Sequence, residues 1–303
     1  MGSLTPERAR YLRAPHLTLD GRSTLVISMG SSPDASLLVG RRAELRTITR
    51  HVHRAARGSG SLILISGGPG LGKSRLIHET LLRAEAKGFR CCSAVCSEGF
   101  VAPALSAWRR VLQTCGVSVT YGDTTNRFAL YRRMTEAIAS VAASVPLSMA
   151  VDDLQWADMD SLQFARFLLA DLDHIPLLLV CAYRDDGSDS RISAMVGSLL
   201  KHERTVALHL NPVPAEGARK YLSGRPTVSD DEAEDIIALA EGVPLFLKAL
   251  ADWPDERSAL LDGLRGRSAP PVHLQQFRSL VEYRMSGTDP HVRTVLVVAS
   301  FLG

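Results

Sequence analysis

A run of small residues that ends in lysine and serine carries the clearest chemical signal in this chain. Residues 67–74 are Gly-Gly-Pro-Gly-Leu-Gly-Lys-Ser and fit the phosphate-binding pattern G-x-x-x-x-G-K-[ST]. Glycine lets successive backbone N–H groups turn inward around a polyphosphate, while Lys73 reaches the β- and γ-phosphates and Ser74 offers a hydroxyl to Mg²⁺. The predicted nucleotide-binding residues here are Gly68, Pro69, Gly70, Leu71, Gly72, Lys73, Ser74 and Arg75.

Two neighbouring aspartates are the second candidate group. Asp152 and Asp153 follow the apolar run 146–151, which has the composition of a buried strand. A phosphate-bound Mg²⁺ needs a carboxylate at a neighbouring strand end, so we expect Asp152 to hold the metal together with Ser74. Asp153 could then orient and deprotonate the attacking water. The alternative is a strand-terminal turn, which acidic residues also favour.

Arg184 completes the predicted catalytic set with Lys73 and Asp153. It follows the apolar run 176–183, and a guanidinium at a strand tip beside the site is well placed to bind a γ-phosphate. A surface salt bridge to one of the two aspartates that follow it is the alternative.

Alternating strand and helix patterns must position these residues. A short β-branched run precedes the phosphate loop and an amphipathic helical pattern follows it. The alternation predicts an α/β fold, a parallel sheet with helices on both faces. The strands are expected at 61–66, 88–96, 146–151, 176–183 and 205–210. After Pro212 and Pro214 only helical patterns remain, near 214–223, 229–241, 244–253, 273–285 and 288–302.

The composition fits a soluble globular chain. Net charge is +3 with a pI near 8.7, which is too mild to argue for nucleic acid, so we expect no direct nucleic-acid binding. No apolar run approaches the ~20 residues of a membrane span, and the N-terminus lacks the apolar centre of a signal peptide, which favours a cytoplasmic location without membrane contact. The five cysteines are odd in number and crowded, so we expect reduced, buried thiols.

Four runs along the chain together resemble a known family. They are Leu-Val-Gly-Arg at 38–41, Val-Asp-Asp-Leu-Gln-Trp-Ala-Asp at 151–158, Tyr-Arg at 183–184 and Glu-Gly-Val-Pro-Leu-Phe-Leu at 241–247. With the phosphate loop, this order resembles the STAND class of AAA-like ATPases. It is most similar to the ATPase module of large bacterial LuxR-type transcriptional regulators, over about residues 38–302.

The resemblance implies further site residues and a domain plan. Val39 and Gly40 would contact adenine, and Pro244 would pack at the base from a helical lid. Residues 1–37 would be a poorly ordered tail, with a possible short strand at 24–29. The remaining expected domains are an ATPase core at 38–212, a helical lid at 213–268 and the start of a truncated winged-helix domain at 269–303.

The expected function is therefore a slow Mg²⁺-dependent ATPase that switches between ATP and ADP states in signalling and transcription control. Two departures from the family bear on this prediction. Asp153 stands where vigorous AAA ATPases usually carry glutamate, and the expected sensor and DNA-binding regions do not occur before residue 303, so self-association or a missing remainder of the chain is expected. The alternatives are a non-hydrolysing assembly module, or the ATPase partner of a nucleotide cyclase or of an origin-recognition-like DNA loader.

Overall fold

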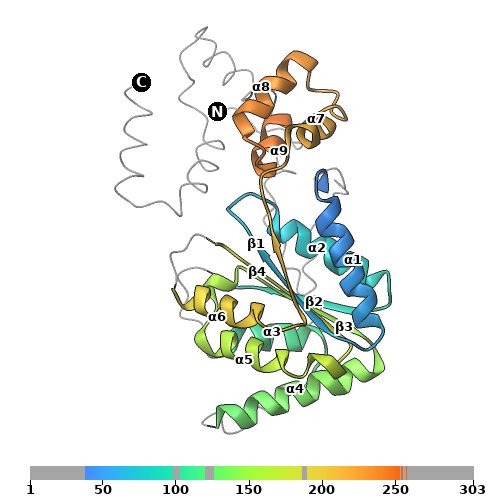
Figure 1. The fold of residues 1–303 in the computed structure, drawn as a ribbon, viewed down its shortest axis with the longest axis vertical. Coiled ribbons are helices and arrows are strands. Elements are labelled where there is room, and N and C mark those ends of the chain that lie inside the picture. The colour runs from blue at the N-terminus through green and yellow to red at the C-terminus, as the bar shows by residue number, and fades with distance from the viewer. Residues whose placement is uncertain are drawn as a thin grey trace, which may run out of the picture.

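The core of the protein is a five-stranded, fully parallel sheet (Figure 1). The computed structural model describes residues 38–97, 103–119, 126–185, 190–252, 254 and 257. The strand order is β2-β3-β4-β1-β5. The strands are β1 (Ser61–Ser66), β2 (Arg90–Val95), β3 (Leu147–Asp152), β4 (Leu177–Tyr183) and β5 (Thr205–His209). The α/β class expected from the sequence is confirmed, and each strand lies within two residues of its expected bounds.

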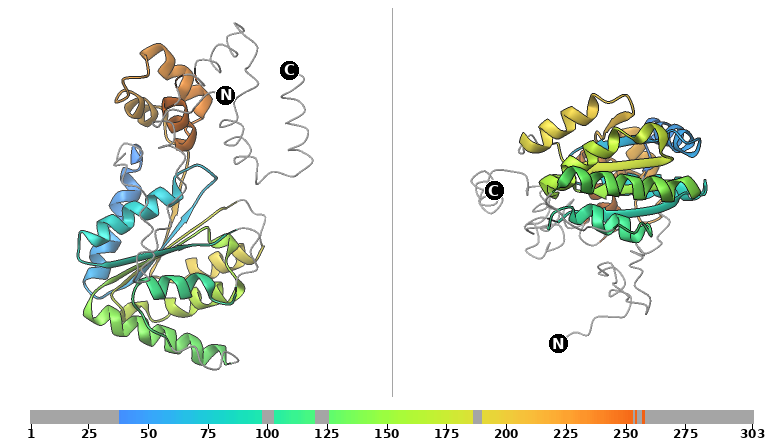
Figure 2. Two further views of the ribbon diagram at one scale, coloured as in Figure 1. Left: turned by 180° about the vertical axis from the view of Figure 1, so that it is seen from behind. Right: turned by 90° about the horizontal axis from the view of Figure 1, so that it is seen from below.

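Alternate residues of the central strands enter two separate cores. In β1, Leu62 and Leu64 pack on one face of the sheet, whereas Ile63 and Ile65 pack on the other. All four side chains are at most 1 % exposed. Continuous apolar strands of this kind are stable only where helices cover both faces of a parallel sheet. Figures 1 and 2 show these two helix layers on opposite sides of the sheet.

Two helices, α1 (Arg42–Ala56) and α2 (Lys73–Glu85), cover one face of the sheet. The other face packs against α3 (Ser106–Thr114), α4 (Arg127–Ser144), α5 (Met159–Leu169) and α6 (Ser190–Leu200). Side-chain caps define two of these helix starts, because Asn126 and Asp158 accept hydrogen bonds from Ala129 N and Ser161 N. We did not expect α6 from the sequence. It connects β4 to β5 and packs against α5.

Three helices follow the last strand: α7 (Ala215–Leu222), α8 (Asp230–Ala240) and α9 (Pro244–Asp252). A capping box starts α8, in which the Ser229 side chain and Glu232 bond each other's backbone N–H groups. In Figure 1 these helices lie beyond the end of β5, and we call them the lid helices. The expected strand at 24–29, the helices at 273–285 and 288–302, the tail 1–37 and the winged helix at 269–303 lie outside the described residues.

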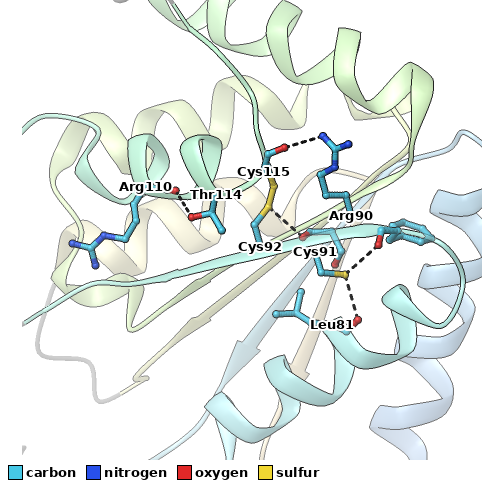
Figure 3. The surroundings of a disulfide bond; sticks show 9 residues. Leu81, Arg90, Cys91, Cys92, Arg110, Thr114 and Cys115 are labelled. Atoms are coloured by element: carbon cyan, nitrogen blue, oxygen red, sulfur yellow. Dashed lines mark hydrogen bonds between the residues drawn. A yellow bond between two sulfur atoms is a disulfide. The ribbon is translucent and has the colours of Figure 1, made fainter. Parts of the chain in front are cut away.

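The expectation of reduced cysteines is wrong for one pair. Cys92 in β2 and Cys115 at the end of α3 are joined by a disulfide, with Cα atoms 5.7 Å apart (Figure 3). They lie 23 positions apart in sequence, so only the packing of α3 on β2 reveals the pair. Cys91, Cys96 and Cys181 are free. Burial raises the pKa of the Cys91 and Cys96 thiols to about 12, so these thiols stay protonated.

Candidate nucleotide site

The phosphate loop, residues 67–74, connects the carboxyl end of β1 to the first residue of α2. Gly70 and Gly72 adopt the left-handed φ values +75° and +94°. A Cβ on Gly70 would lie 2.9 Å from a Val243 methyl carbon, so a side chain is excluded there by both strain and space. The glycines thus give the loop the backbone shape that turns N–H groups toward an anion at the start of α2.

Lys73 is the first residue of α2, and its side chain is held at the loop. Its Nζ donates to the carbonyl oxygens of Gly67, at 2.8 Å, and Gly68, at 3.0 Å. The residue is only 7 % exposed. Burial is the main cause that lowers the pKa of Lys73, and Arg184 lowers it further, while Asp153 and Asp152 act in the opposite direction. Lys73 thus lies close enough to both aspartates and to Arg184 for their charges to act on it.

Ser74 and Asp152 lie against each other across the end of the sheet. The Ser74 side chain is hydrogen-bonded to the Asp152 carboxylate, which is 8 % exposed at the last residue of β3. Burial is the largest cause and raises the pKa of Asp152, while the Ser74 hydrogen bond opposes that rise. A hydroxyl beside a carboxylate offers the hard oxygen ligands that suit Mg²⁺. The described residues contain no cluster of three metal-ligating side chains. The pair still fits Mg²⁺, because phosphates and water supply the remaining ligands of the ion in such sites.

Asp153 has an unusual backbone conformation directly after β3. Its φ of +52° is left-handed, a conformation that non-glycine residues rarely adopt, and its N–H donates to Asp152 Oδ1 at 2.9 Å. Gln155 holds the Asp153 side chain, because its Nε2 donates to Asp153 Oδ1 at 2.9 Å. The strained residue is thus fixed from both sides, as is common where a side chain must point in one direction.

The same glutamine also bonds the end of β4. The backbone N–H of Arg184 donates to Gln155 Oε1 at 3.1 Å. A single amide therefore connects Asp153, after β3, to Arg184, after β4. We call Asp153, Gln155 and Arg184 the acid–amide–arginine cluster. Gln155 lies in the run 151–158, but the sequence predicts no role for it, since nothing in the pattern tells which way its side chain points.

The segment before α1 lies beside the phosphate loop and the first lid helix. Arg41 is 5 % exposed, and its Nη2 donates to Leu71 O at 3.2 Å and to Asn211 O at 2.6 Å. Gly40 has φ +84°, and a Cβ there would lie 3.2 Å from Val213 Cγ1. A Cβ on Gly217 of α7 would lie 3.7 Å from Val39 Cγ1, so Val39 lies beside that helix. This arrangement brings the expected adenine-contacting residues Val39 and Gly40 to the junction of loop and lid.

The start of α9 contacts the phosphate loop directly. The Leu245 N–H donates to Gly70 O at 3.3 Å, and Val243 packs where Gly70 has no side chain. Pro244 is the first residue of α9, between these two contacts. Gly242 O accepts from Val213 N at 2.7 Å, which joins this turn to the segment before α7. The lid contacts missed by sequence reasoning are those of Val243 and Leu245, and the buried contacts of Arg41 were also missed.

The five-stranded parallel sheet with helices on both faces matches the P-loop NTPase fold, and comparison with known proteins supports that match. A family model described as an AAA ATPase domain matches residues 37–180, which include the phosphate loop and both aspartates. Two solved structures share the fold: Cdc6p from Pyrobaculum aerophilum (15 % identity, TM-score 0.53, covering 77 % of this chain and 67 % of that one) and the Orc1 protein of Aeropyrum pernix in complex with DNA (20 %, 0.51, 84 % and 67 %). At these identities the likeness concerns the fold alone.

One curated relative is an uncharacterized protein, R02095, from Rhizobium meliloti (strain 1021). It is 25 % identical over 312 aligned residues, which cover 86 % of this chain. The chain spans only 29 % of the length of that relative. Within the part of the chain that the structure describes, no helix has the length and apolar character needed to cross a membrane.

Proposed function

We propose that this chain binds ATP and ADP, hydrolyses ATP slowly with Mg²⁺, and uses the bound nucleotide as a switch in transcription control. The observation that carries the proposal is that the phosphate loop, Asp152 with Asp153, and Arg184 lie at the carboxyl ends of the neighbouring parallel strands β1, β3 and β4. The AAA ATPase domain match supports a nucleotide-dependent ATPase module. The regulatory role rests on the resemblance to LuxR-type regulators, and the cytoplasmic location is proposed from the sequence alone.

Each residue at the site has a distinct proposed task. Lys73 binds the β- and γ-phosphates and stabilises the charge that develops on them. Ser74 and Asp152 hold Mg²⁺, which when bound neutralises phosphate charge and orients the terminal phosphate. Arg184 binds the γ-phosphate from the end of β4, and Asp153 orients and deprotonates the attacking water.

Gln155 is proposed as a positioning residue. It does not need to touch the nucleotide, because its amide fixes the Asp153 carboxylate and the Arg184 backbone at the same time. The water-orienting acid and the γ-phosphate-binding arginine are therefore held at a set separation. Aspartate is one methylene shorter than glutamate, which suits a slow reaction and a long-lived ATP state.

The lid helices are the proposed output of the switch. Val39 and Gly40 would contact adenine, and Pro244 would close the base of the site from α9. Leu245 N–H donates to Gly70 O, and Arg41 donates to Leu71 O. A change in the conformation of the phosphate loop would therefore alter two hydrogen bonds near the lid helices. We propose residues 38–212 as the ATPase core and 213–268 as the lid domain.

Identification of the nucleotide that copurifies with the protein, followed by phosphate-release assays with ATP and Mg²⁺, tests this proposal. Bound ADP or ATP together with slow phosphate release is the expected result. Tight binding without any phosphate release would instead support the non-hydrolysing assembly module. A chain that binds neither nucleotide would refute both.

A further inference from the structure

Helix α1 presents a continuous basic surface on the side away from the sheet. Ile48, Val52 and Ala55 are its buried residues. At 100° per residue, six basic residues occupy about 120° of the opposite side. We call these residues the α1 basic face: Arg42, Arg46, Arg50, His53, Arg54 and Arg57. Arg54 is half-buried and the other five are exposed. Figure 1 shows α1 along the outside of the sheet.

The α1 basic face has no matching acidic groups on its own helix. The only acidic residue of α1 is Glu44, and it pairs with Arg41 at 3.2 Å. Among the described residues, Arg42, Arg46, Arg50 and Arg57 take part in no ion pair. Their charge is therefore available to an external anion.

Neighbouring elements add further arginines at both flanks of the face. Arg83 of α2 donates from Nη1 to Thr49 Oγ1 at 3.1 Å. Beyond the end of α1, Arg204 Nη1 and Arg54 Nε both donate to Ser59 Oγ, at 2.7 Å and 3.4 Å. Arg50, His53, Arg54, Arg57 and Ser59 line one shallow hollow there. Both flanking arginines are themselves paired with carboxylates, Arg83 with Glu79 at 2.9 Å and Arg204 with Asp173.

Fold stability does not account for this arrangement. Like charges four residues apart on a helix destabilise it, and Arg42, Arg46, Arg50 and Arg54 form three consecutive pairs of this kind. The helix dipole stabilises cations in the last turn of a helix. Arg42, however, lies in the first turn, where the dipole disfavours a positive charge. Four arginines in this register are more costly to the fold than neutral residues would be.

We propose that the α1 basic face binds the phosphate backbone of a nucleic-acid duplex without recognition of base sequence. A helix of 15 residues extends about 22 Å, enough to contact several phosphates. The face carries only guanidinium and imidazole groups, and guanidinium pairs with phosphate oxygens through two parallel hydrogen bonds. From the sequence we expected no such contact, because the net charge of +3 hides the concentration of charge on one helix.

Two observations favour a duplex over other anionic partners. Protein interfaces centre on apolar and aromatic side chains, and none of the large exposed hydrophobic residues among those described belongs to α1. Interfaces with nucleic acid are instead strongly positive and polar. Single-strand binding uses aromatic side chains on which bases stack, and α1 contains no Phe, Tyr or Trp.

The inference can be tested with the full chain and a labelled duplex of random sequence, titrated at about 50 mM and about 200 mM salt. We expect micromolar dissociation constants that are the same for unrelated sequences, with a slope of log affinity against log salt of about −3 to −5. Lys73→Ala should not alter this binding, because Lys73 lies outside the face. The result is therefore independent of the proposed ATPase function.

Matched variants assign the binding to α1. The triple change Arg42→Gln, Arg46→Gln and Arg50→Gln should weaken binding at least about tenfold and reduce the slope by about 3, one phosphate for each arginine. The control variant removes the same charge from exposed arginines of α4 and α5, with Arg132→Gln, Arg133→Gln and Arg166→Gln. Its affinity for the duplex should fall by less than about threefold. Equal thermal melting and ATP binding would show that both triple variants fold.

Three results would overturn the inference. Equal losses in the two triple variants would mean that only net charge matters. A salt slope near zero would exclude phosphate contacts. Binding of poly-glutamate but not of the duplex, lost in the α1 triple variant, would assign the face to an acidic protein partner.

Discussion

The phosphate loop and the acid–amide–arginine cluster both lie at the carboxyl ends of the central strands, but they are built in different ways. The loop is one unbroken run, and its geometry comes from backbone conformation at glycines such as Gly70 and Gly72. The cluster joins residues after two different strands, because the Gln155 side chain donates to Asp153 and accepts from the Arg184 N–H. The loop is thus a local structure, whereas the cluster exists only when β3 and β4 are aligned.

This difference separates nucleotide binding from hydrolysis. A phosphate is held by many backbone groups at once, so binding should tolerate changes in the cluster. Hydrolysis needs one carboxylate in one orientation, so it should be sensitive to small shifts there. The following predictions test that separation, from the largest expected effect to the smallest.

Asp153→Asn should lower kcat for ATP hydrolysis by about 100-fold or more, because a positioned general base contributes 10²–10⁴ in rate. The affinity for ATP should stay within about twofold of wild type, since the loop is unchanged. Phosphate release and calorimetric titration measure the two effects. Asp152→Asn is the matched control and should instead weaken binding only when Mg²⁺ is present. A wild-type rate in Asp153→Asn would remove Asp153 from the mechanism.

Lys73→Ala should weaken ATP binding at least about 30-fold, because loss of one partner of a buried charged contact costs roughly 2–5 kcal/mol. Calorimetric titration of both proteins decides this, and Lys73→Arg tests whether charge alone is sufficient. Arg83→Ala, on the same helix but outside the loop, is the control and should bind ATP normally. Unchanged affinity in Lys73→Ala would disprove the phosphate site.

Gln155→Ala should lower kcat about threefold to tenfold, as expected for the loss of hydrogen bonds worth about 0.5–1.5 kcal/mol each. KM for ATP should hardly change. Gln155→Glu should be worse than Gln155→Ala, because it places a carboxylate against Asp153 Oδ1. If KM rises while kcat is retained, Gln155 contacts the nucleotide and is not a positioning residue.

Mg²⁺-dependent ATP affinity should fall as pH is lowered from about pH 8 to about pH 5, by a few-fold. Burial raises the pKa of Asp152, so this carboxyl takes up a proton at a higher pH than an ordinary aspartate and then no longer binds the metal. Titrations with Mg²⁺ and with EDTA isolate the metal-dependent part. In Asp152→Asn this part of the pH dependence should be absent, and its persistence would point to another group.

Much of the fold was predictable because its signals are local. The runs that became β1, β3 and β4 are short and mostly apolar, and every residue in them is buried in the parallel sheet. The phosphate loop was predictable for the same reason, since its motif lies within eight residues. In contrast, α6 was missed, and the strand order β2-β3-β4-β1-β5 did not follow from the sequence.

Most of the contacts that were not predicted join residues far apart in sequence. Arg41 bonds Asn211 across 170 positions, and the disulfide joins Cys92 to Cys115 against the expectation from the odd cysteine count. The start of α9 reaches Gly70 through Leu245. None of these pairs has a signal in sequence spacing, because each depends on how packed elements approach one another.

The sequence by itself determined the phosphate loop, the aspartates that end β3 and the alternation of strands and helices, because backbone conformation and burial periodicity depend on neighbouring residues. Only the tertiary structure decided which strand ends meet, so that Gln155 joins Asp153 to Arg184. It also decided that Arg41 is buried while Arg42, Arg46, Arg50 and Arg57 of the α1 basic face are exposed. The physical reason is that contact between distant segments follows from packing, which no single stretch of chain contains.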